Sequence, residues 1–437
     1  MSREILSPRC ISDLREGLKK SEPVRYRENG NRATDGAQLL QRLEVVAEQV
    51  GITRVADISD LSPLGYPVFQ ATRPNLLHHP AMGNNTGSQG KGATKLQAKI
   101  SCLMEGVEAY CAEPRNVDFV RGTHRFLRGH QVTLDPQAMQ GPYSHRKAEP
   151  DEPLLWAPAY EVRHDTEILV PAQSVYCFLP LRSYRTRGVF PASSNGLASG
   201  ATYLEASIHA LYELIERMYI AHGEKGAASI ECLYEEEFPG FDFDAYEQAL
   251  GAELELQLFA VRLPGIPNIP MIACVLVGDH QVFTGWGCAG DVDTSIMRAI
   301  SEAMQSYTVL VSSARDDLRH HASLPSRERP PPKRNPIKSF LHHLPEYRTL
   351  HIEQLRAEVL DRTYDDLRDE FDALIAWLSD RGYPVVCISN LTRIGIDIPV
   401  VKAVVPGLPT KWVLERQVGG GWDDLAIIAR RYSLGPP

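Results

Sequence analysis

The chain has 437 residues, of which 43% are hydrophobic and 23% are charged, and its formal net charge is −9. This length exceeds the roughly 250–300 residues at which a single hydrophobic core usually stops growing, so one large domain and two lobes are both open. The negative charge argues against non-specific binding to nucleic acid or to anionic membranes, and no apolar run reaches the length of about eighteen residues that a membrane span requires.

The cysteines and the N-terminus indicate where the protein works. Eight cysteines are scattered along the chain without any C-x-x-C pair, which argues against a zinc site and against a disulfide framework. The N-terminal stretch lacks the long apolar run of a secretion signal. We therefore expect a protein of a reducing compartment, the cytoplasm.

In chain order, the sequence first predicts a polar tail over residues 1–20 and then a helix. The stretch "DGAQLLQRLEVVAEQVG" places Asp35 as an N-cap, apolar residues at helical spacing and Gly51 as a C-terminal stop. Two strands are expected next, "ITRVADIS" (52–59) and "YPVFQATRP" (66–74).

The second half of the chain continues to mix strands and helices. Strands are predicted at "LELQLFAVRL" (254–263), "MIACVLV" (271–277), "YPVVCISN" (383–390) and "IPVVKAVVPG" (398–407). An amphipathic helix is predicted at "DDLRDEFDALIAWLSDRG" (365–382). Polar surface turns or loops are expected at 140–153 and 235–237, and a proline-rich, basic loop or linker at 323–340. This pattern predicts an α/β fold, an α+β sandwich with mixed sheets.

Three stretches share one arrangement of apolar and polar residues. In "KISCLMEGVEAY" an apolar stripe at helical spacing is followed, one residue behind, by Ser101, Glu105 and Glu108. The same pattern recurs 108 residues later in "SSNGLASGATYLEASIHALYELIER" with His209, Glu213 and Glu216, and again in "IMRAISEAMQSY" with Arg298, Glu302 and Gln305. Each stretch also follows a glycine, at positions 92, 200 and 290.

Residues three and four apart meet on one face of a helix, so each of these helices presents two oxygen-bearing side chains at the same place. Like charges at this spacing destabilise an isolated helix by about 0.2–0.5 kcal/mol per pair, and by more beside a core. A cation is therefore expected there, and Mg²⁺ is the natural choice because it binds carboxylate and amide oxygens and shares its shell with substrate phosphates. Three such helices predict a cage for a nucleotide triphosphate; the alternative is that they are exposed, salt-bridged faces of an unrelated α/β protein.

At these residues the sequence resembles the YcaO family, ATP-dependent enzymes that activate a peptide-bond oxygen by phosphorylation. The resemblance rests on "GSQGKGATKLQAKISCLMEGVE", "SSNGLASGATYLEASIHALYELIER", "GWGCAGDVDTSIMRAISEAMQS", "ARDD" and "IPVVKAVVPGL", which contain E-x-x-E, E-x-x-ER and E-x-x-Q in that order. It spans about residues 20–410, so we expect a YcaO-type catalytic domain over 21–410 and a C-terminal extension over 411–437.

The resemblance also implies roles for individual residues. The Mg²⁺ and phosphate-site ligands would be Glu105, Glu108, Glu205, Glu213, Glu216 and Glu302, completed by Arg217 and Gln305. The nucleotide pocket would include Lys91, Ser101, Ser194, Asn195 and His209. Some assignments stay open, because Lys91 also suits a plain loop, His209 also suits a satisfied core histidine, and Arg315 would either face the nucleotide or cap a helix C-terminus.

Three positions depart from the family pattern. Ala201 stands where the family usually has Asn, Met218 where an acid often follows the "ER" pair, and Tyr307 where an arginine is common after "QS". None of these departures removes a carboxylate from the three stripes. We therefore expect ATP binding to be retained, with differences in geometry or in the handling of the substrate.

The resemblance implies a chemistry with ATP and Mg²⁺ as cofactors and a peptide or protein as substrate. A nucleophile adds to a backbone amide carbonyl, the resulting oxyanion takes the γ-phosphate of ATP, and loss of phosphate leaves the backbone with that oxygen replaced. A side chain as nucleophile gives an azoline, sulfide gives a thioamide and an amine gives an amidine. No Ser-His-Asp or Cys-His arrangement is required.

Thioamidation, in a pathway for ribosomally synthesised and post-translationally modified peptides, is the favoured outcome. Azoline-forming relatives commonly end in Pro-x-Pro-x-Pro, whereas this sequence ends "YSLGPP", and its motifs are closest to those of members that work with a TfuA partner. We therefore expect a TfuA-like sulfur-delivery protein and, as is usual among relatives, a homodimer. The alternatives are an azoline-forming or amidine-forming enzyme and a non-catalytic ATP-binding accessory protein. No leader-binding domain is visible, so a partner or an exposed sheet edge would recruit the substrate.

Overall fold

The computed structural model describes the chain in fifteen stretches: residues 10–27, 29–62, 65–74, 87–114, 118–139, 148–149, 151–177, 179, 188–190, 193–224, 227–234, 254–265, 267–278, 282–312 and 349–410. The predictions for Arg315, for the segments 235–237 and 323–340 and for the extension 411–437 lie outside these residues. Among the helices of the described residues, none is long and apolar enough to cross a membrane.

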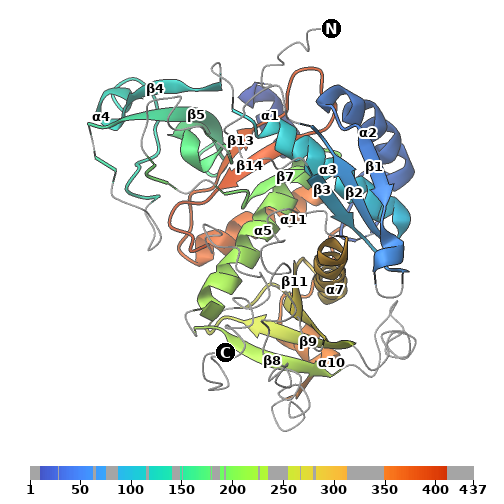
Figure 1. Cartoon of the computed structure of the whole chain (residues 1–437). Coiled ribbons are helices and arrows are strands. Elements are labelled where there is room, and N and C mark those ends of the chain that lie inside the picture. Colours follow the sequence, from blue (N-terminus) through green and yellow to red (C-terminus); the bar gives the residue numbers. More distant parts are fainter. Residues whose placement is uncertain are drawn as a thin grey trace, which may run out of the picture.

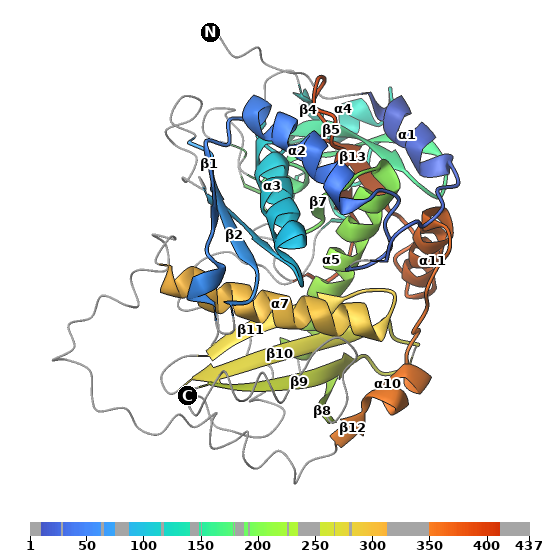
Figure 2. The same cartoon turned by 90° about the vertical axis from the view of Figure 1, so that its right-hand side faces the viewer.

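The first of three sheets is built from the N-terminal part of the chain. Its antiparallel strands run in the order β1 (Arg54–Asp57), β2 (Val68–Thr72) and β3 (Gly87–Lys91), and the short η1 helix (Ser59–Leu61) lies between the first two. Helix α3 (Lys95–Cys111) packs on β2 and β3, and α2 (Gly36–Val50) packs on α3 (Figure 2).

Helix α2 begins and ends as its sequence predicts. The side chain of Asp35 accepts hydrogen bonds from the backbone N–H groups of Ala37 and Gln38, which would otherwise lack a partner in the first turn. Gly51 ends the helix in the left-handed region with φ of 85°, a conformation that costs glycine little.

The second sheet joins segments from the middle and the end of the chain. Its strands run in the order β4 (Val120–Thr123), β5 (Pro153–Glu161), β13 (Cys387–Asn390), β14 (Val400–Val404) and β7 (Leu197–Ser199), and β6 (Thr166–Pro171) also pairs with β5. The helices of this part of the molecule are α1 (Ile11–Lys19), α4 (His124–Leu127), η4 (Ala172–Ser174), α5 (Tyr203–Glu224) and α11 (Leu367–Asp380).

The third sheet has the order β11 (Val282–Cys288), β10 (Met271–Gly278), β9 (Leu254–Arg262), β8 (Ser229–Tyr234) and β12 (Thr349–His351). Its strands pair antiparallel except for β12, which runs parallel to β8. Helix α7 (Val292–Val311) covers one face, and α10 (Ile352–Glu358) follows β12 (Figures 1 and 2). The strands and helices predicted in the second half of the chain are confirmed, and so is the mixed α/β fold class.

Helix α5 packs between the second and third sheets (Figure 1). Its buried residues, such as Leu211 and Ile215, belong to one apolar cluster with Phe259 of β9 and Val401 of β14. The eight cysteines are free thiols, as expected.

The N-terminal boundary differs from the prediction. Residues 11–19, expected to lie in a polar tail, form helix α1, in which Ile11, Leu14 and Leu18 are buried against the central cluster. These three residues lie on one helical face, and the polar residues between them hide that pattern in the sequence. The folded body therefore begins before residue 20.

Three strand–turn–helix units repeat within this fold: β3–α3, β7–α5 and β11–α7. In each unit the strand is at the edge of its sheet, and three residues connect it to the helix. Each connection ends in a residue whose side chain accepts a hydrogen bond from a backbone N–H of the first helical turn. These residues are Thr94, Thr202 and Asp291. The first glutamate of each stripe, Glu105, Glu213 or Glu302, lies ten residues after the first residue of its helix. The common register predicted from the sequence is therefore a property of the folded units.

Glycines let these helices lie directly on their strands. A Cβ atom at Gly90 of β3 would lie 2.1 Å from the carbonyl oxygen of Ala98, and one at Gly285 of β11 would lie 2.0 Å from that of Ala299. Any side chain at either position would force the strand and the helix apart.

Candidate active site

Helices α3, α5 and α7 bring five glutamates together between the three sheets, and we call Glu105, Glu108, Glu213, Glu216 and Glu302 the carboxylate cluster. Glu108 of α3 accepts two hydrogen bonds of 2.7 Å, from the backbone N–H and the hydroxyl of Ser199 at the end of β7. Burial is the main cause that raises the pKa of Glu108 from 4.5 to about 8, and the charges of Glu105 and Glu213 add to it. These three carboxylates therefore lie within electrostatic reach of one another.

Helix α5 contributes the centre of the cluster. Glu213 accepts a hydrogen bond of 3.1 Å from the backbone N–H of Gly196, and burial raises its pKa against the opposing charge of Arg217. Glu216 is 9% exposed and lies 3.4 Å from the guanidinium of Arg217. Burial also raises the pKa of Glu216, and the charges of Glu302 and Glu213 reinforce the shift.

The cluster is completed from β3 and α7. Lys91 of β3 forms an ion pair of 2.7 Å with Glu302 of α7. Glu105 accepts a hydrogen bond of 2.6 Å from the backbone N–H of Gln89, on the same edge strand. The edge of the first sheet thus supplies both a cation and a backbone donor to the site.

Glu205, although it was grouped with these glutamates from the sequence, lies apart from them. It precedes Glu213 by two turns of α5, which corresponds to about 12 Å along the helix axis. Its two oxygens accept hydrogen bonds from the backbone N–H groups of Ala33, at 2.7 Å, and Ala201, at 3.0 Å, and the residue is 3% exposed.

The other residues singled out from the sequence lie on the same helices or on the loop before β7. Ser101 occupies on α3 the position that His209 occupies on α5, and Gln305 follows Glu302 by one turn of α7. Ser194 is exposed, and the backbone N–H of Asn195 donates to the hydroxyl of Ser193 at 3.0 Å.

Two of the three departures from the family pattern point away from this cluster. Met218 is buried in the apolar cluster around α5, and the ring of Tyr307 packs edge-on against Phe283.

A small, partly open cavity lies beside Glu205. Residues 30–32, the turn 289–291 and Glu370 of α11 form part of its wall, and the remaining lining comes from Glu205, Ile208, His209, Tyr212 and Arg298. Arg298 shares the stripe register of α7, whereas nothing in the sequence singles out Arg32.

Two arginines and three acidic residues line the cavity. The pKa of Arg298 is lowered by burial first and by the charge of Arg32 second, so the two guanidinium groups are close. No ion pair of either arginine occurs among the described residues; their hydrogen bonds go to the carbonyl oxygens of Asn29 and Cys288. Enclosure by the protein, followed by the charges of Arg298, Arg32 and Lys91, lowers the pKa of His209 from 6.5 to about 3. The cavity thus combines two guanidinium groups and a neutral imidazole with the carboxylates of Glu205, Asp291 and Glu370.

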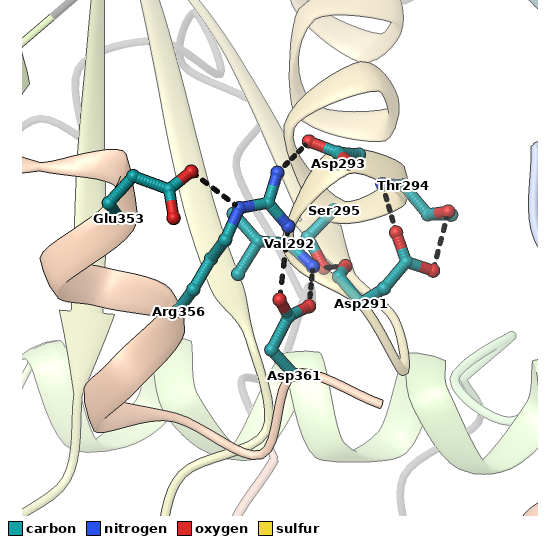
Figure 3. Close-up of polar contacts among 8 residues, drawn as sticks. All are labelled: Asp291, Val292, Asp293, Thr294, Ser295, Glu353, Arg356 and Asp361. Carbon is teal, nitrogen blue, oxygen red and sulfur yellow. Dashed lines mark hydrogen bonds and ion pairs between the residues drawn. The ribbon is translucent and has the colours of Figure 1, made fainter. Parts of the chain in front are cut away.

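The start of α7 is fixed by a polar network from α10 (Figure 3). Arg356 of α10 forms ion pairs with Asp293, at 2.5 Å, and with Asp361, at 3.0 Å. Asp361 also accepts the backbone N–H of Val292 at 2.8 Å, one of the donors that a helix N-terminus leaves unpaired. Because Arg298 and Glu302 follow within three turns, this network sets their positions.

A buried lysine that sequence reasoning missed lies beneath the site. Lys402 of β14 is 2% exposed, and its ammonium group donates a hydrogen bond to the carbonyl oxygen of Ser193, at the start of the loop that holds Glu213. Burial lowers its pKa, while Cys177 and Glu213 oppose that shift. The residue escapes detection because "VVKAVV" has the pattern of a buried strand in which a lysine is normally exposed.

The donor set of the carboxylate cluster fits Mg²⁺. Among the described residues, no three acidic, histidine or cysteine side chains already stand at the spacing of a preformed metal site. Mg²⁺ does not require one, because it is usually bound by one or two carboxylates and completes its shell with water and substrate phosphates. Five neighbouring glutamates, of which Glu108, Glu213 and Glu216 have pKa values raised mainly by burial, provide the carboxylates, and Lys91, Arg217, Arg32 and Arg298 suit the phosphates.

Comparison with known proteins gives one family. The YcaO family model, described as a cyclodehydratase that binds ATP and Mg²⁺, matches residues 89–409. An uncharacterised protein of Methanothermobacter thermautotrophicus is 29% identical over 387 residues, covering 85% of this chain and 93% of its own length. A Rhizobium leguminosarum bv. trifolii protein described by its location in the tfuA 3′ region is 31% identical over 312 residues, covering 66% of this chain and 69% of its own length. An uncharacterised Mycobacterium tuberculosis protein is 29% identical over 300 residues, and this chain spans only 65% of that protein's length.

Solved structures share the fold. YcaO from Methanopyrus kandleri, bound with AMPPCP and Mg²⁺, superposes with a TM-score of 0.67 at 22% identity, covering 89% of this chain and 95% of that one. A heterocyclase in complex with substrate and cofactor gives 0.68 at 20% identity, covering 92% of this chain and 56% of that one. The E. coli microcin synthetase McbBCD complex gives 0.54 at 15% identity, covering 78% and 84%. At these identities the likeness establishes the architecture.

Proposed function

This chain belongs to the YcaO family, and we propose that it is an ATP- and Mg²⁺-dependent enzyme that converts a backbone amide of a peptide into a thioamide. The observation that carries the proposal is the carboxylate cluster, in which three helices in one register place five glutamates beside Lys91 and Arg217. Carboxylates this close together, with Glu216 buried and Glu108, Glu213 and Glu302 half-buried, are costly without a cation.

Mg²⁺ would be held by glutamates of the cluster, with Glu108, Glu213, Glu216 and Glu302 best placed by their mutual influence. Bound there, it would neutralise the charge that develops on the transferring phosphoryl group. Ser199 and the backbone of Gly196 orient Glu108 and Glu213 for this task. Lys91 pairs with Glu302 and would turn to the phosphates when the nucleotide enters.

The cavity beside the cluster suits the rest of the nucleotide's charge. Arg298 lies one helical turn before Glu302, and Arg32 faces it from the N-terminal segment. A guanidinium group can bind two phosphate oxygens at once, and it keeps its charge at any physiological pH. His209, being neutral, would donate or accept a hydrogen bond there without adding charge.

The chemistry needs positioning more than a reactive side chain. Hydrosulfide adds to the amide carbonyl carbon, and the oxyanion so formed attacks the γ-phosphate, which releases ADP. The phosphorylated adduct then loses its S–H proton to solvent and expels phosphate together with the former amide oxygen, which leaves a C=S bond in an unbroken backbone. The cations around the site stabilise the charge on both oxygens during these steps.

The genomic location of one relative favours sulfide over other nucleophiles. A relative 31% identical to this chain is described by its place in the tfuA 3′ region. A TfuA-like protein as sulfur donor also agrees with the burial of seven of the eight cysteines. Buried thiols with raised pKa values, such as those of Cys102 and Cys177, are poor sulfur carriers. We further propose that the enzyme is a homodimer, which light scattering of the purified protein would test. Azoline formation, amidine formation and non-catalytic ATP binding are the competing functions.

Mass spectrometry of a precursor peptide coexpressed with this protein, with and without a TfuA-like partner, tests the proposal. We expect a linear product heavier by the difference between sulfur and oxygen, formed only with the partner or with added sulfide. A product lighter by one water would mean an azoline. Peptide-dependent release of ADP and phosphate, followed in parallel, separates an enzyme from a binding protein, which would release neither.

A further inference from the structure

Lys402 interrupts the apolar pattern of β14. Val400 and Val404 lie on the same face of the strand, two residues away on either side, and both belong to an apolar cluster. Lys402 between them is 2% exposed, and among the described residues it forms no ion pair. A buried cation costs free energy that an apolar side chain would not, so packing alone does not account for this lysine.

The ammonium group of Lys402 anchors one end of a turn, and we call residues 193–196 the β7 turn because they lead into β7. At this end, Lys402 donates a hydrogen bond to the carbonyl oxygen of Ser193. At the other end, the backbone N–H of Ala403, the next residue of β14, donates to the carbonyl oxygen of Gly196 at 2.8 Å. Neighbouring residues of one buried strand therefore hold both ends of the turn.

The β7 turn lies directly on β14. Gly196 has φ of 78°, and a Cβ atom there would lie 2.7 Å from the carbonyl oxygen of Ala403. The backbone N–H of the same glycine donates a hydrogen bond of 3.1 Å to Glu213 of the carboxylate cluster. A shift of the turn on β14 would therefore move the donor that orients Glu213.

Lys402 is also close enough to Glu213 to act on it electrostatically. Burial raises the pKa of Glu213, and the charges of Arg217 and Lys402 oppose that shift. The carbonyl oxygen of Ser193 accepts a second hydrogen bond, of 3.4 Å, from the thiol of Cys177, which stays neutral because burial raises its pKa. The ammonium is thus the charged donor of the two, and a charge-assisted hydrogen bond is about twice as strong as a neutral one.

We infer that Lys402 is a positioning residue of the active site: it seats the β7 turn through Ser193, and the turn orients Glu213 for Mg²⁺. The inference rests on the proposed function, in which Glu213 is one of the glutamates that hold the metal. Lys402 acts through the turn and is assigned no contact with the metal or with the nucleotide. This role accounts for a cation at a position where the strand pattern predicts an apolar residue.

Lys402→Met tests the inference, because methionine is apolar and similar in length to lysine. Two measurements are made without peptide: urea unfolding of the metal-free protein, and calorimetric titration of the protein with ATP in the presence of Mg²⁺. We expect an unchanged or higher unfolding midpoint, since a buried charge is removed, together with an affinity for ATP and Mg²⁺ that is about tenfold weaker, since the turn loses its charged anchor. Lys20→Met, which removes an exposed cation far from β14 in sequence, is the control and should change neither.

Lys402→Gln separates the hydrogen bond from the charge. Its amide is neutral but can still donate to the carbonyl oxygen of Ser193. If Lys402 acts by seating the turn, this variant should bind ATP and Mg²⁺ within about threefold of the wild-type affinity, well above the Lys402→Met variant. Equal losses in the two variants would show that only the charge matters, and the positioning role would be rejected.

The remaining outcomes also decide the question. Unchanged or tighter binding by Lys402→Met would overturn the inference, and a lower unfolding midpoint in step with weaker binding would make Lys402 a residue of the fold alone. Wild-type binding of ATP and Mg²⁺ without peptide-dependent release of ADP and phosphate would reject the proposed enzyme and leave the role of Lys402 standing. Absence of wild-type binding would overturn both.

Discussion

At the scale of single residues, three charged side chains around the site are held by backbone groups. Glu213 is fixed by the N–H of Gly196, Glu205 by those of Ala33 and Ala201, and Lys402 by the carbonyl of Ser193. Backbone groups belong to rigid strands and turns, so they orient a side chain without cancelling its charge. The charges remain available for a ligand of opposite sign.

The carboxylates of the cluster should therefore matter for the ligand and little for the fold. We expect Glu108→Gln and Glu216→Gln each to weaken binding of Mg²⁺ and ATP by about tenfold, or ~1.4 kcal/mol, in calorimetry. Glutamine resembles the protonated carboxyl that burial already favours, so the metal-free protein should unfold at an unchanged or higher temperature. Glu44→Gln, in an exposed ion pair with Lys99, is the control, and unchanged affinity in both cluster variants would reject the cage.

The raised pKa of Glu108 makes both the stability of the protein and its affinity for Mg²⁺ and ATP depend on pH. Burial raises the pKa of Glu108 from 4.5 to about 8, so the folded, metal-free protein retains this proton where the unfolded chain has lost it. The stability from this group is full below about pH 4.5 and declines as the pH rises through 8. Metal binding must expel the proton, so wild-type affinity for Mg²⁺ and ATP should rise between pH 6 and pH 8, and this slope should be shallower in Glu108→Gln.

At the scale of elements, the site is a set of three edge strands that each turn into a helix. The three-residue connections and the shared register deliver Glu105, Glu213 and Glu302 to one region even though they come from three different sheets. The distance between strand and helix in each unit then decides whether the carboxylates meet. In the β3–α3 and β11–α7 units that distance is set by glycine, at Gly90 and Gly285.

Gly90→Ala should separate α3 from β3. The added Cβ would lie 2.1 Å from both the carbonyl oxygen of Ala98 and the backbone nitrogen of Cys102, so we expect a loss of about 1–3 kcal/mol in the free energy of unfolding, measured in urea, together with weaker ATP binding. Gly87→Ala is the matched control in the same strand, because its nearest neighbour would be 4.0 Å away. A stable Gly90→Ala protein with wild-type ATP affinity would show that this close approach is dispensable.

At the scale of the whole molecule, distant segments are joined by fully buried polar contacts. Arg393, which is 0% exposed, forms an ion pair of 2.8 Å with Asp118, 275 residues earlier. It also donates hydrogen bonds to the carbonyl oxygens of Cys111, the last residue of α3, and of Glu113. The C-terminal part of the second sheet is thereby locked to the end of the helix that carries Glu105 and Glu108.

Arg393→Met should be strongly destabilising, because it leaves the carboxylate of Asp118 buried and unpaired. We expect the free energy of unfolding to fall by about 3–5 kcal/mol. Arg125→Met, which removes an ion pair whose two side chains are each 64% exposed, should change it by less than about 0.5 kcal/mol. Similar losses in the two variants would mean that burial adds nothing to the Arg393 pair.

The sequence by itself determined the features that depend on neighbours within a few residues. Helix periodicity, the cap at Asp35 and the stop at Gly51 follow from local hydrogen bonding and packing, so the three stripes and their common register were predictable. The motifs that resemble those of the family also depend on local spacing, so the family was predictable from the sequence. Helix α1 was missed because its three buried residues are outnumbered by polar ones.

Only the tertiary structure decided which side chains share a space. Asn31 meets Glu370 across 339 positions and Lys402 meets Ser193 across 209, and no periodic pattern marks a contact that the packing of three sheets creates. The same packing sends Glu205 to the backbone of Ala33 and Ala201 and away from the five other glutamates, although all six look alike along the chain. Chain geometry fixes which face of a helix a residue occupies, but what lies opposite that face is set by the fold as a whole.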